Sequence, residues 1–242
     1  MDGETFQKRT GLSEADLMVL KTVPLFSGLD RATIINLLAD SSIRRYPRGT
    51  TLFLQDDPVD RFCVVFEGWV KLYCQSEDGF ESVVHVAGPC ESFAEAIIFD
   101  NQAYPFSAEI AEDARLLSIP KPSFLNKLKA DVDICLAIMG ALSQSHRYLV
   151  QTIEQMASKS SVERLAVFLE SLCGAYCNGK CDDCELHLPI DKGLIAGRLN
   201  MQPETLSRSL VKLRDMGVKT KGNRVMVADM DKLRAYAHGS AG

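Results

Sequence analysis

No run of apolar residues in this 242-residue chain reaches the roughly 18 that a membrane-spanning helix requires. The first ten residues, MDGETFQKRT, also lack the apolar stretch of a secretory signal. These two absences predict a cytoplasmic protein that does not enter a membrane. Because 46% of the residues are hydrophobic and 24% are charged, the chain has enough apolar side chains for one large core or two modest ones.

Motifs of the common enzyme classes are also missing from the sequence. We find no Ser/His/Asp arrangement, no glycine-rich loop that could cradle a phosphate, and no metal-hydrolase spacing. The sequence therefore predicts a binding protein and not an enzyme.

Charge is divided unevenly along the chain. The net charge is −5, but residues 189–242 contain ten Lys or Arg and five Asp or Glu, whereas residues 1–188 contain 17 and 27. A basic C-terminal part beside an acidic remainder is typical of a protein in which one domain meets a polyanion. Small domains also differ by several charges without such a partner, so the asymmetry alone leaves both explanations open.

The N-terminal half changes from helical to β-rich patterns. Residues 12–40 predict short helices around a turn-rich segment, PLFSGLD, at 24–30. Residues 43–119 contain short β-rich runs separated by Gly, Asp and Pro, which predict an antiparallel sandwich or roll. The clearest runs are TTLFL (50–54), RFCVVF (61–66), WVKLY (69–73) and SVVHVA (82–87).

A long helix is predicted at residues 131–157, which contain no proline and a single glycine, with Asp131 as its N-cap. Seven of its residues recur at alternating spacings of four and three, the heptad pattern by which two helices form a coiled coil. We therefore predict a homodimer through this helix, although a helix that packs only against its own β domain is the alternative. The predicted seam residues are Cys135, Met139, Leu142, His146, Leu149, Ile153 and Met156.

The C-terminal part begins with the pattern of a helix-turn-helix. Asp191 can cap a short helix at 192–199, and Pro203 suits the first position of a second helix at 203–216. Three leucines recur at helical spacing in the second helix and should be buried: Leu206, Leu210 and Leu213.

A basic hairpin is predicted directly after the second helix. Gly217 would end that helix, and KTKGNRVMV (219–227) would form two strands that turn at Gly222 and Asn223. Helix, turn, helix and hairpin in this order predict a winged helix-turn-helix that binds double-stranded DNA.

The second helix carries the side chains that we expect to read DNA bases. Glu204, Ser207 and Arg208 lie in its N-terminal half, the half that enters the major groove in such domains. Arginine can donate two hydrogen bonds to guanine, and a carboxylate can accept one from cytosine. The alternative is a solvated face with an ion pair between Glu204 and Arg208. Four basic residues are predicted to contact phosphates: Lys212, Lys219, Lys221 and Arg224.

The stretch IDKGLIAGRLNMQPETLSRSLVKLRDMGV (190–218) resembles the DNA-binding end of the CRP/FNR superfamily of transcription regulators. PLFSGL, YPRGTTLF (46–53) and RFCVVFEGWVKLY (61–73) are similar to the β-roll of that family, so the resemblance covers nearly the whole chain. The pattern E-x-x-S-R, which starts at Glu204, looks like the FNR type. Pro203 precedes it as in the nitric-oxide-responsive denitrification regulators, the members that this chain most resembles.

The resemblance implies an α+β protein with a β-roll sensor at 1–120, a dimerisation helix at 121–157 and a winged helix-turn-helix at 158–242. It implies an inverted repeat resembling TTGAT-N4-ATCAA as the DNA partner, with RNA polymerase as a candidate protein partner. Effector binding or a redox change would rotate the DNA-binding domains about the dimer helix. By resemblance, the target genes would concern anaerobic or nitrogen-oxide respiration.

Cyclic AMP is not the expected effector. In members that bind cyclic nucleotides, a Gly-Glu pair and an arginine hold the phosphate, and the corresponding stretch here is residues 92–114. Alanine replaces that glycine, and residues 72–114 contain no Lys or Arg but nine Asp or Glu. A buried phosphate would therefore lack a cationic partner. The effector-pocket residues that the resemblance implies are Ala94, Glu95, Phe106 and Ser107.

The eight cysteines suggest thiols or metal ligands more than disulfides, because we expect a reducing compartment. Four lie within twelve residues, as C-x3-C-x3-C-x2-C, in a predicted loop at 173–184. This spacing predicts a Zn²⁺ site or an Fe–S cluster, with oxidisable thiols as the alternative. The candidate ligands are Cys173, Cys177, Cys181 and Cys184. The others, Cys63, Cys74, Cys90 and Cys135, are predicted to be core residues.

Haem is a less favoured cofactor, because no histidine stands out as an axial ligand. The histidines are His85, His146, His187 and His238. Two other functions stay open at this point. One is a cyclic-nucleotide receptor with an atypical pocket, and the other is a regulatory subunit whose C-terminal domain does not bind DNA.

Overall fold

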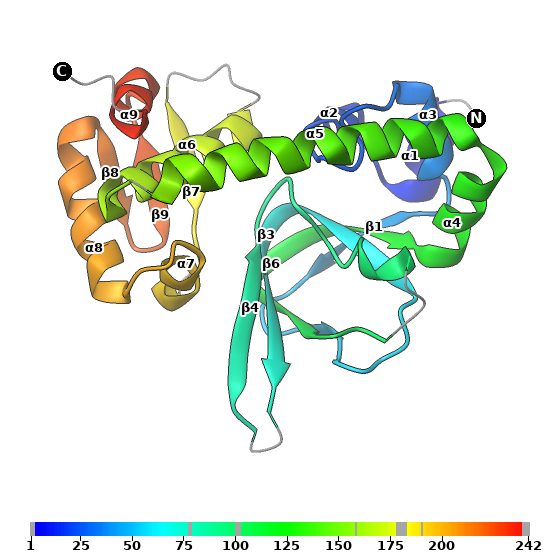
Figure 1. The fold of residues 1–242 in the computed structure, drawn as a ribbon, viewed down its shortest axis with the longest axis horizontal. Coiled ribbons are helices and arrows are strands. Elements are labelled where there is room, and N and C mark those ends of the chain that lie inside the picture. The colour runs from blue at the N-terminus through cyan, green and yellow to red at the C-terminus, as the bar shows by residue number, and fades with distance from the viewer. Residues whose placement is uncertain are drawn as a thin grey trace. The chain divides into compact units, whose positions relative to one another are not determined.

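The computed structural model describes residues 3–76, 79–99, 103–157, 159–177, 183–189 and 191–238 (Figure 1). The chain divides into two compact units, residues 1–149 and residues 150–242. Within the described ranges, no helix is both long enough and apolar enough to cross a membrane. The fold is α+β, as predicted.

Three short helices open the N-terminal unit: α1 (Gly3–Thr10), α2 (Glu14–Leu20) and α3 (Arg31–Leu37). A capping box starts α2, because the Ser13 hydroxyl accepts a hydrogen bond from the Asp16 N–H while the Asp16 carboxylate accepts one from the Ser13 N–H. Asp30 caps α3 by accepting a hydrogen bond from the Thr33 N–H at 2.7 Å. The prediction of short helices at 12–40 is confirmed by α2 and α3, whereas α1 was not predicted.

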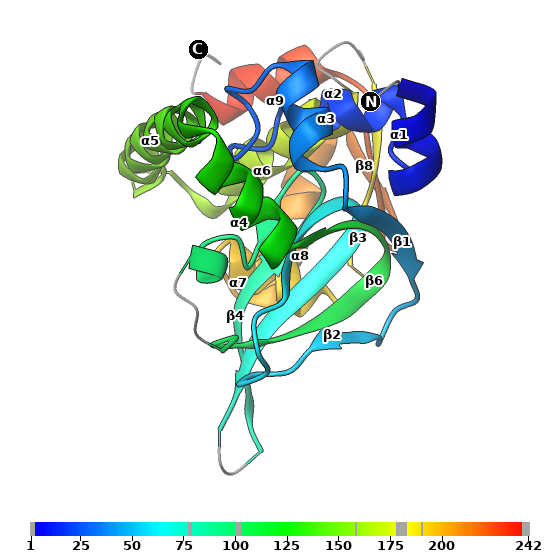
Figure 2. The ribbon, with the colours of Figure 1, turned by 90° about the vertical axis from the view of Figure 1, so that its right-hand side faces the viewer.

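An antiparallel sheet forms the centre of this unit, as predicted. Its main strands run in the order β1-β6-β3-β4, with β2 paired to β6 and β5 paired to β3. In Figure 2, α1–α3 gather at one end of the sheet and the β3–β4 hairpin projects from the other. The strands are β1 (Ser42–Tyr46), β2 (Thr51–Phe53), β3 (Arg61–Gln75), β4 (Glu81–Ala87), β5 (Ser92–Phe93) and β6 (Ser107–Pro120).

One boundary in the sheet was predicted wrongly. The runs at 61–66 and 69–73 are parts of a single strand, β3, whose pairing with β6 shifts around Glu67 and Gly68. Gly68 has a φ of +81°, and a Cβ there would lie 2.2 Å from the carbonyl oxygen of Asp113. Glycine at this position lets β3 pass β6 closely, so the Glu-Gly pair marks an irregularity within a strand and not a turn.

Two helices follow the sheet: α4 (Lys121–Ala130) and α5 (Val132–Ala157). The Asp131 carboxylate caps α5 by accepting hydrogen bonds from the N–H groups of Asp133 and Ile134, as predicted. Phe124 of α4 packs edge-to-face on Phe62 of β3, with ring centroids 5.0 Å apart. The short 3-10 helix η1 (Ile97–Phe99) lies between β5 and β6.

The C-terminal unit contains four helices after α5 and a three-stranded sheet in the order β7-β9-β8, within the described residues. Its elements are α6 (Ser161–Cys177), β7 (Cys184–His187), α7 (Lys192–Arg198), α8 (Pro203–Lys212), the 3-10 helix η2 (Leu213–Met216), β8 (Val218–Lys221), β9 (Arg224–Val227) and α9 (Met230–Ala237).

The predicted helix-turn-helix and hairpin are confirmed, with two corrections. Cys173 and Cys177 belong to α6, so the predicted cysteine-rich loop at 173–184 begins inside a helix. The helix predicted at 203–216 tightens to 3-10 geometry from Leu213 and ends at Gly217, whose φ is +83°. Strand β7 and helix α9 were not predicted.

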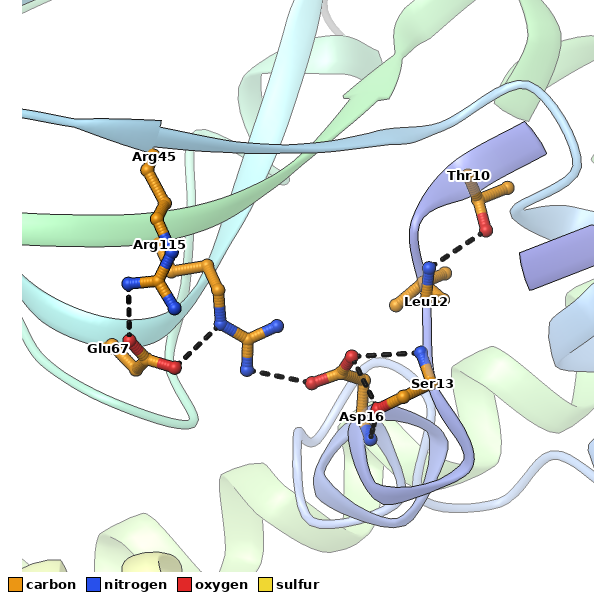
Figure 3. Close-up of polar contacts among 7 residues, drawn as sticks. All are labelled: Thr10, Leu12, Ser13, Asp16, Arg45, Glu67 and Arg115. Atoms are coloured by element: carbon orange, nitrogen blue, oxygen red, sulfur yellow. Dashed lines mark hydrogen bonds and ion pairs between the residues drawn. The ribbon is translucent and has the colours of Figure 1, made fainter. Parts of the chain in front are cut away.

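A chain of ion pairs joins α2 to the sheet (Figure 3). Arg115 of β6 contacts the carboxylate of Asp16 at 2.8 Å and that of Glu67 at 2.7 Å, and Glu67 also pairs with Arg45 at 3.0 Å. Burial raises the pKa of Asp16, but hydrogen bonds from Arg115 and Ser13 outweigh it, so this pKa lies below its usual value. The N-terminal helices are therefore held to the sheet by a largely buried charge pair.

Candidate DNA-binding face and sensor pocket

Helix α8 is fixed by its apolar side. Leu206 and Leu210 keep only 1% and 6% of their surface exposed, and Leu213, the first residue of η2, keeps 0%, as predicted. Pro203 stands at the first helical position, where its missing N–H costs no intrahelical hydrogen bond. These contacts determine which side of α8 faces solvent.

The solvent side of α8 carries the residues predicted to read bases. Glu204, Ser207 and Arg208 are all exposed, and so is Lys212. The Arg208 guanidinium donates to the Thr205 hydroxyl at 3.3 Å and to the Glu204 carbonyl oxygen at 3.4 Å. Both distances are long for hydrogen bonds, so Arg208 can exchange these contacts at low cost. In this described helix Arg208 contacts the backbone of Glu204, not its carboxylate, so the expected alternative of an i,i+4 ion pair is not formed.

The first helix of the motif, α7, is held at both ends. The Asp191 carboxylate accepts a hydrogen bond from the Gly193 N–H at 2.8 Å, the predicted N-cap. At the other end, Asn200 adopts a left-handed φ of +50°, and the Met201 N–H donates to the Ala196 carbonyl at 2.9 Å. This tight turn sets the angle between α7 and α8.

The three-stranded sheet forms the wing. Its inner face is apolar, with Val218, Val225, Val227 and Leu186 almost fully buried. The predicted phosphate contacts Lys219, Lys221 and Arg224 are exposed on the outer face. Strand β7 was not predicted, although the alternation of apolar and polar residues in Cys184-Glu185-Leu186-His187 is a sequence signal for it, and the structure buries the two apolar ones.

The predicted effector-pocket residues lie on β6 and just after β5. Ser107 is 4% exposed, and its hydroxyl accepts a hydrogen bond from the Gln55 N–H at 2.9 Å. Ala94 is buried with a left-handed φ of +65°, and Glu95 is half-buried. The Ser107 hydroxyl therefore supports the neighbouring backbone of the sheet.

Aromatic rings surround this region. The ring of Phe53 stacks on Tyr104 at 3.7 Å between centroids, and it lies 6.3 Å from the rings of both Phe93 and Phe106. Tyr104 is 1% exposed and donates its hydroxyl hydrogen to the Arg61 carbonyl at 2.7 Å. Phe106, directly before Ser107, packs partly buried against this apolar core.

Helix α5 has one buried and one exposed apolar side in the N-terminal unit. Ile134, Ile138 and Ala141 are buried. The exposed apolar residues of α5 are Val132 (68%), Leu136 (56%), Met139 (54%) and Leu142 (39%). Of the other predicted seam residues, Cys135 is half-buried against the unit's own core and His146 is exposed. The side chains of Leu149, Ile153 and Met156 lie outside the described ones.

Only two of the four cysteines predicted as metal ligands have side chains that the structure describes. Cys173 and Cys184 are buried, whereas the Cys177 side chain and all of Cys181 lie outside the described residues. In the described part of the chain, no three His, Cys, Asp or Glu side chains gather as metal ligands would. Cys63 is a core residue, as predicted, and burial raises the pKa of its thiol to about 12.

Both units of the chain match known protein families. Residues 43–131 match the cyclic nucleotide-binding domain family, and residues 163–236 match the Crp-like helix-turn-helix domain family. The first match covers most of the central sheet, and the second covers α6–α9.

Three relatives span most of the chain. A solved structure from Ruegeria pomeroyi, described as a candidate cyclic nucleotide-binding protein, is 38% identical with a TM-score of 0.82, over 93% of this chain and 97% of that one. DNR from Pseudomonas aeruginosa is 26% identical with a TM-score of 0.57, over 93% and 99%. Electron transport regulator A of Shewanella oneidensis is 26% identical over 85% of this chain and 83% of its own.

Proposed function

Because the chain belongs to the CRP/FNR family of transcription regulators, we propose that it binds an inverted repeat resembling TTGAT-N4-ATCAA as a homodimer and reads it with α8. One observation carries this proposal. Leu206 and Leu210 of α8 are buried, and so is Leu213 directly after it in η2. Glu204, Ser207 and Arg208 therefore project from the opposite side of a helix that is rigidly held. Side chains on a rigid helix can meet base edges at fixed positions.

The homodimer is supported by the exposed apolar side of α5. Met139 and Leu142, two predicted seam residues, remain exposed although the neighbouring Ile138 and Ala141 are buried in their own unit. A row of exposed large apolar side chains on one helix is typical of a protein-protein interface. Members of this family are dimers, and a second copy of α5 is the proposed occupant.

Sedimentation velocity tests the dimer. Met139→Glu would place a charge in the seam, and Gln144→Glu would place the same charge at the outermost heptad position of the same helix. We expect Met139→Glu to shift the protein to monomer at concentrations where the wild type and Gln144→Glu are dimers. Equal dimer fractions in all three proteins would contradict the proposed seam.

The sensor is proposed to respond to a redox change or a nitrogen oxide and not to cyclic AMP. Phe106 contributes a ring next to the Phe53 cluster, and the Ser107 hydroxyl already accepts a hydrogen bond from Gln55. A phosphate there would face aromatic carbon and meet no Lys or Arg from residues 72–114. Calorimetry with cyclic AMP and cyclic GMP should give no binding heat, and saturable binding of either nucleotide would favour the receptor alternative.

The four clustered cysteines are proposed to hold a zinc ion or an Fe–S cluster. Cys173 near the end of α6 and Cys184 at the start of β7 are both buried, so two of the four thiols are shielded from solvent. Metal analysis and an absorption spectrum of protein purified without oxygen would test this part. Stoichiometric zinc or iron that is lost in Cys184→Ser is expected, and the absence of both metals from the wild type would contradict it.

The spacing between the two half-sites of the repeat provides a test of the proposed DNA binding. The wild type should bind the inverted repeat more tightly than a scrambled duplex of the same length. Inserting about five base pairs between the half-sites turns them to opposite faces of the duplex, because one helical turn is about 10.5 base pairs. We expect this insertion to reduce the affinity to that of the scrambled duplex. A wild-type protein that binds all three duplexes equally would contradict sequence-specific recognition.

A further inference from the structure

The outer face of the wing sheet collects more donors than the β8–β9 hairpin alone supplies. In the antiparallel register, His187 of β7 pairs with Arg224 of β9, and Arg224 pairs with Lys221 of β8. Directly paired residues of antiparallel strands share a face. An imidazole, a guanidinium and an ammonium group therefore form one exposed row across three strands.

This row lies at the end of the sheet that carries the wing turn. Gly222 and Asn223 form the turn, and the Leu188 N–H extends the ladder by donating to the Asn223 carbonyl at 2.9 Å. Both turn residues line a cavity of about 30 Å³ together with Leu206 and Leu210 on the buried side of α8. The donor row is thus at the end of the wing that lies beside α8, the helix proposed to enter the DNA groove.

The carboxylate of Glu185 lies close to two members of the row, Arg224 and His187. Glu185 Oε1 lies 3.3 Å from Arg224 Nη1 and 3.7 Å from His187 Nε2. The three side chains keep 44%, 60% and 56% of their surface exposed, in the order Glu185, Arg224, His187. Solvent screens an ion pair at this exposure, so an incoming phosphate can displace it.

We propose that His187 is a further phosphate-contacting residue of the wing and that Glu185 restrains His187 and Arg224 until a DNA phosphate replaces the carboxylate as their partner. The imidazole of His187 has an N–H that can donate to a phosphate oxygen. The inference rests on the proposed DNA binding. It adds strand β7 to the DNA-contacting surface and identifies the Glu185 carboxylate as a group that competes with the phosphate.

The test uses the full-length protein with two fluorescent duplexes of equal length, one with the inverted repeat and one scrambled. Glu185→Gln should tighten binding to both duplexes by about two- to fivefold, the range expected when an exposed ion pair no longer competes. The matched control is Asp231→Asn on α9, which removes the same charge from an exposed ion pair with Arg234 in the same unit. This control should leave both affinities close to the wild-type values.

Two further variants separate a phosphate contact from a structural role. His187→Ala should weaken binding to both duplexes by about two- to tenfold, as expected for the loss of one hydrogen bond. Arg224→Gln should weaken binding more in the Glu185→Gln background than in the wild type, because Arg224 is then no longer restrained. A purely structural ion pair would give the opposite order, since Glu185→Gln would already have removed its benefit.

The outcomes distinguish this inference from the function on which it rests. If Glu185→Gln behaves like Asp231→Asn or weakens binding, the restraint is refuted. If His187→Ala changes neither affinity, the imidazole makes no phosphate contact. If the wing variants have no effect but the wild type still prefers the inverted repeat, only this inference is overturned. If the wild type binds neither duplex, both proposals are overturned.

Discussion

Removing Arg115 should destabilise the N-terminal unit much more than removing its neighbour Arg45. Asp16 is 5% exposed, so Arg115→Met would leave its carboxylate buried with only Ser13 as a described hydrogen-bond partner. Breaking a buried ion pair costs roughly 3–5 kcal/mol, and we expect about 3 kcal/mol because Arg115 itself keeps some contact with solvent. Arg45, whose side chain is 74% exposed, contributes a surface pair to Glu67 that is worth at most about 1 kcal/mol.

The chain has a single tryptophan, Trp69, which is buried in the N-terminal unit, so its fluorescence in urea reports the unfolding of that unit. Arg45→Met is the matched control. The pKa of Asp16 is lowered in the folded protein, so its contribution is present at neutral pH and lost as the pH falls through that folded value. The deficit of Arg115→Met should therefore shrink in acid. Equal urea midpoints for the two variants at neutral pH would contradict the proposed contribution of the Asp16–Arg115 ion pair.

Two more substitutions test how the fold positions its working parts. Gly68→Ala should destabilise the N-terminal unit clearly more than Gly49→Ala. Both glycines have a φ of +81°, but only at Gly68 would a Cβ meet backbone atoms. Similar urea midpoints for the two variants would contradict the close passage of β3 and β6. Asp191→Ala should lower the free energy of unfolding of the C-terminal unit by about 1 kcal/mol, because α7 loses its N-cap. Calorimetry would detect this loss, and an unchanged melting temperature would exclude the capping role.

The DNA-binding end was the part most open to prediction from sequence. Its signals are local: a capping aspartate, a proline at a helix start, leucines at helical spacing and a Gly-Asn turn. Each acts within a few residues, so Asp191, Pro203 and Gly222 all stand where their patterns indicated. The outward direction of Arg208 follows from the burial of the leucines on the other side of α8.

The features that were missed depend on partners distant in sequence. Gly68 suggested a turn, but its role comes from the approach of Asp113, 45 residues later. Likewise, His187 joins the donor row only because β7 pairs with β9 across the intervening helices. Asp16 and Arg115 lie 99 residues apart, and their pairing becomes visible only once α2 packs on the sheet. Sequence pattern alone does not fix such long-range contacts.

The central claim, that Arg208 reads a base, is tested most directly by a double-mutant cycle. Arg208→Ala and the wild type would each be measured on the inverted repeat and on the same duplex with the half-site guanines replaced by 7-deazaguanine, which lacks the N7 acceptor. We predict that Arg208→Ala costs about 1–3 kcal/mol on the natural duplex and much less on the modified one. Equal losses on both duplexes would contradict it and would make Arg208 a phosphate contact.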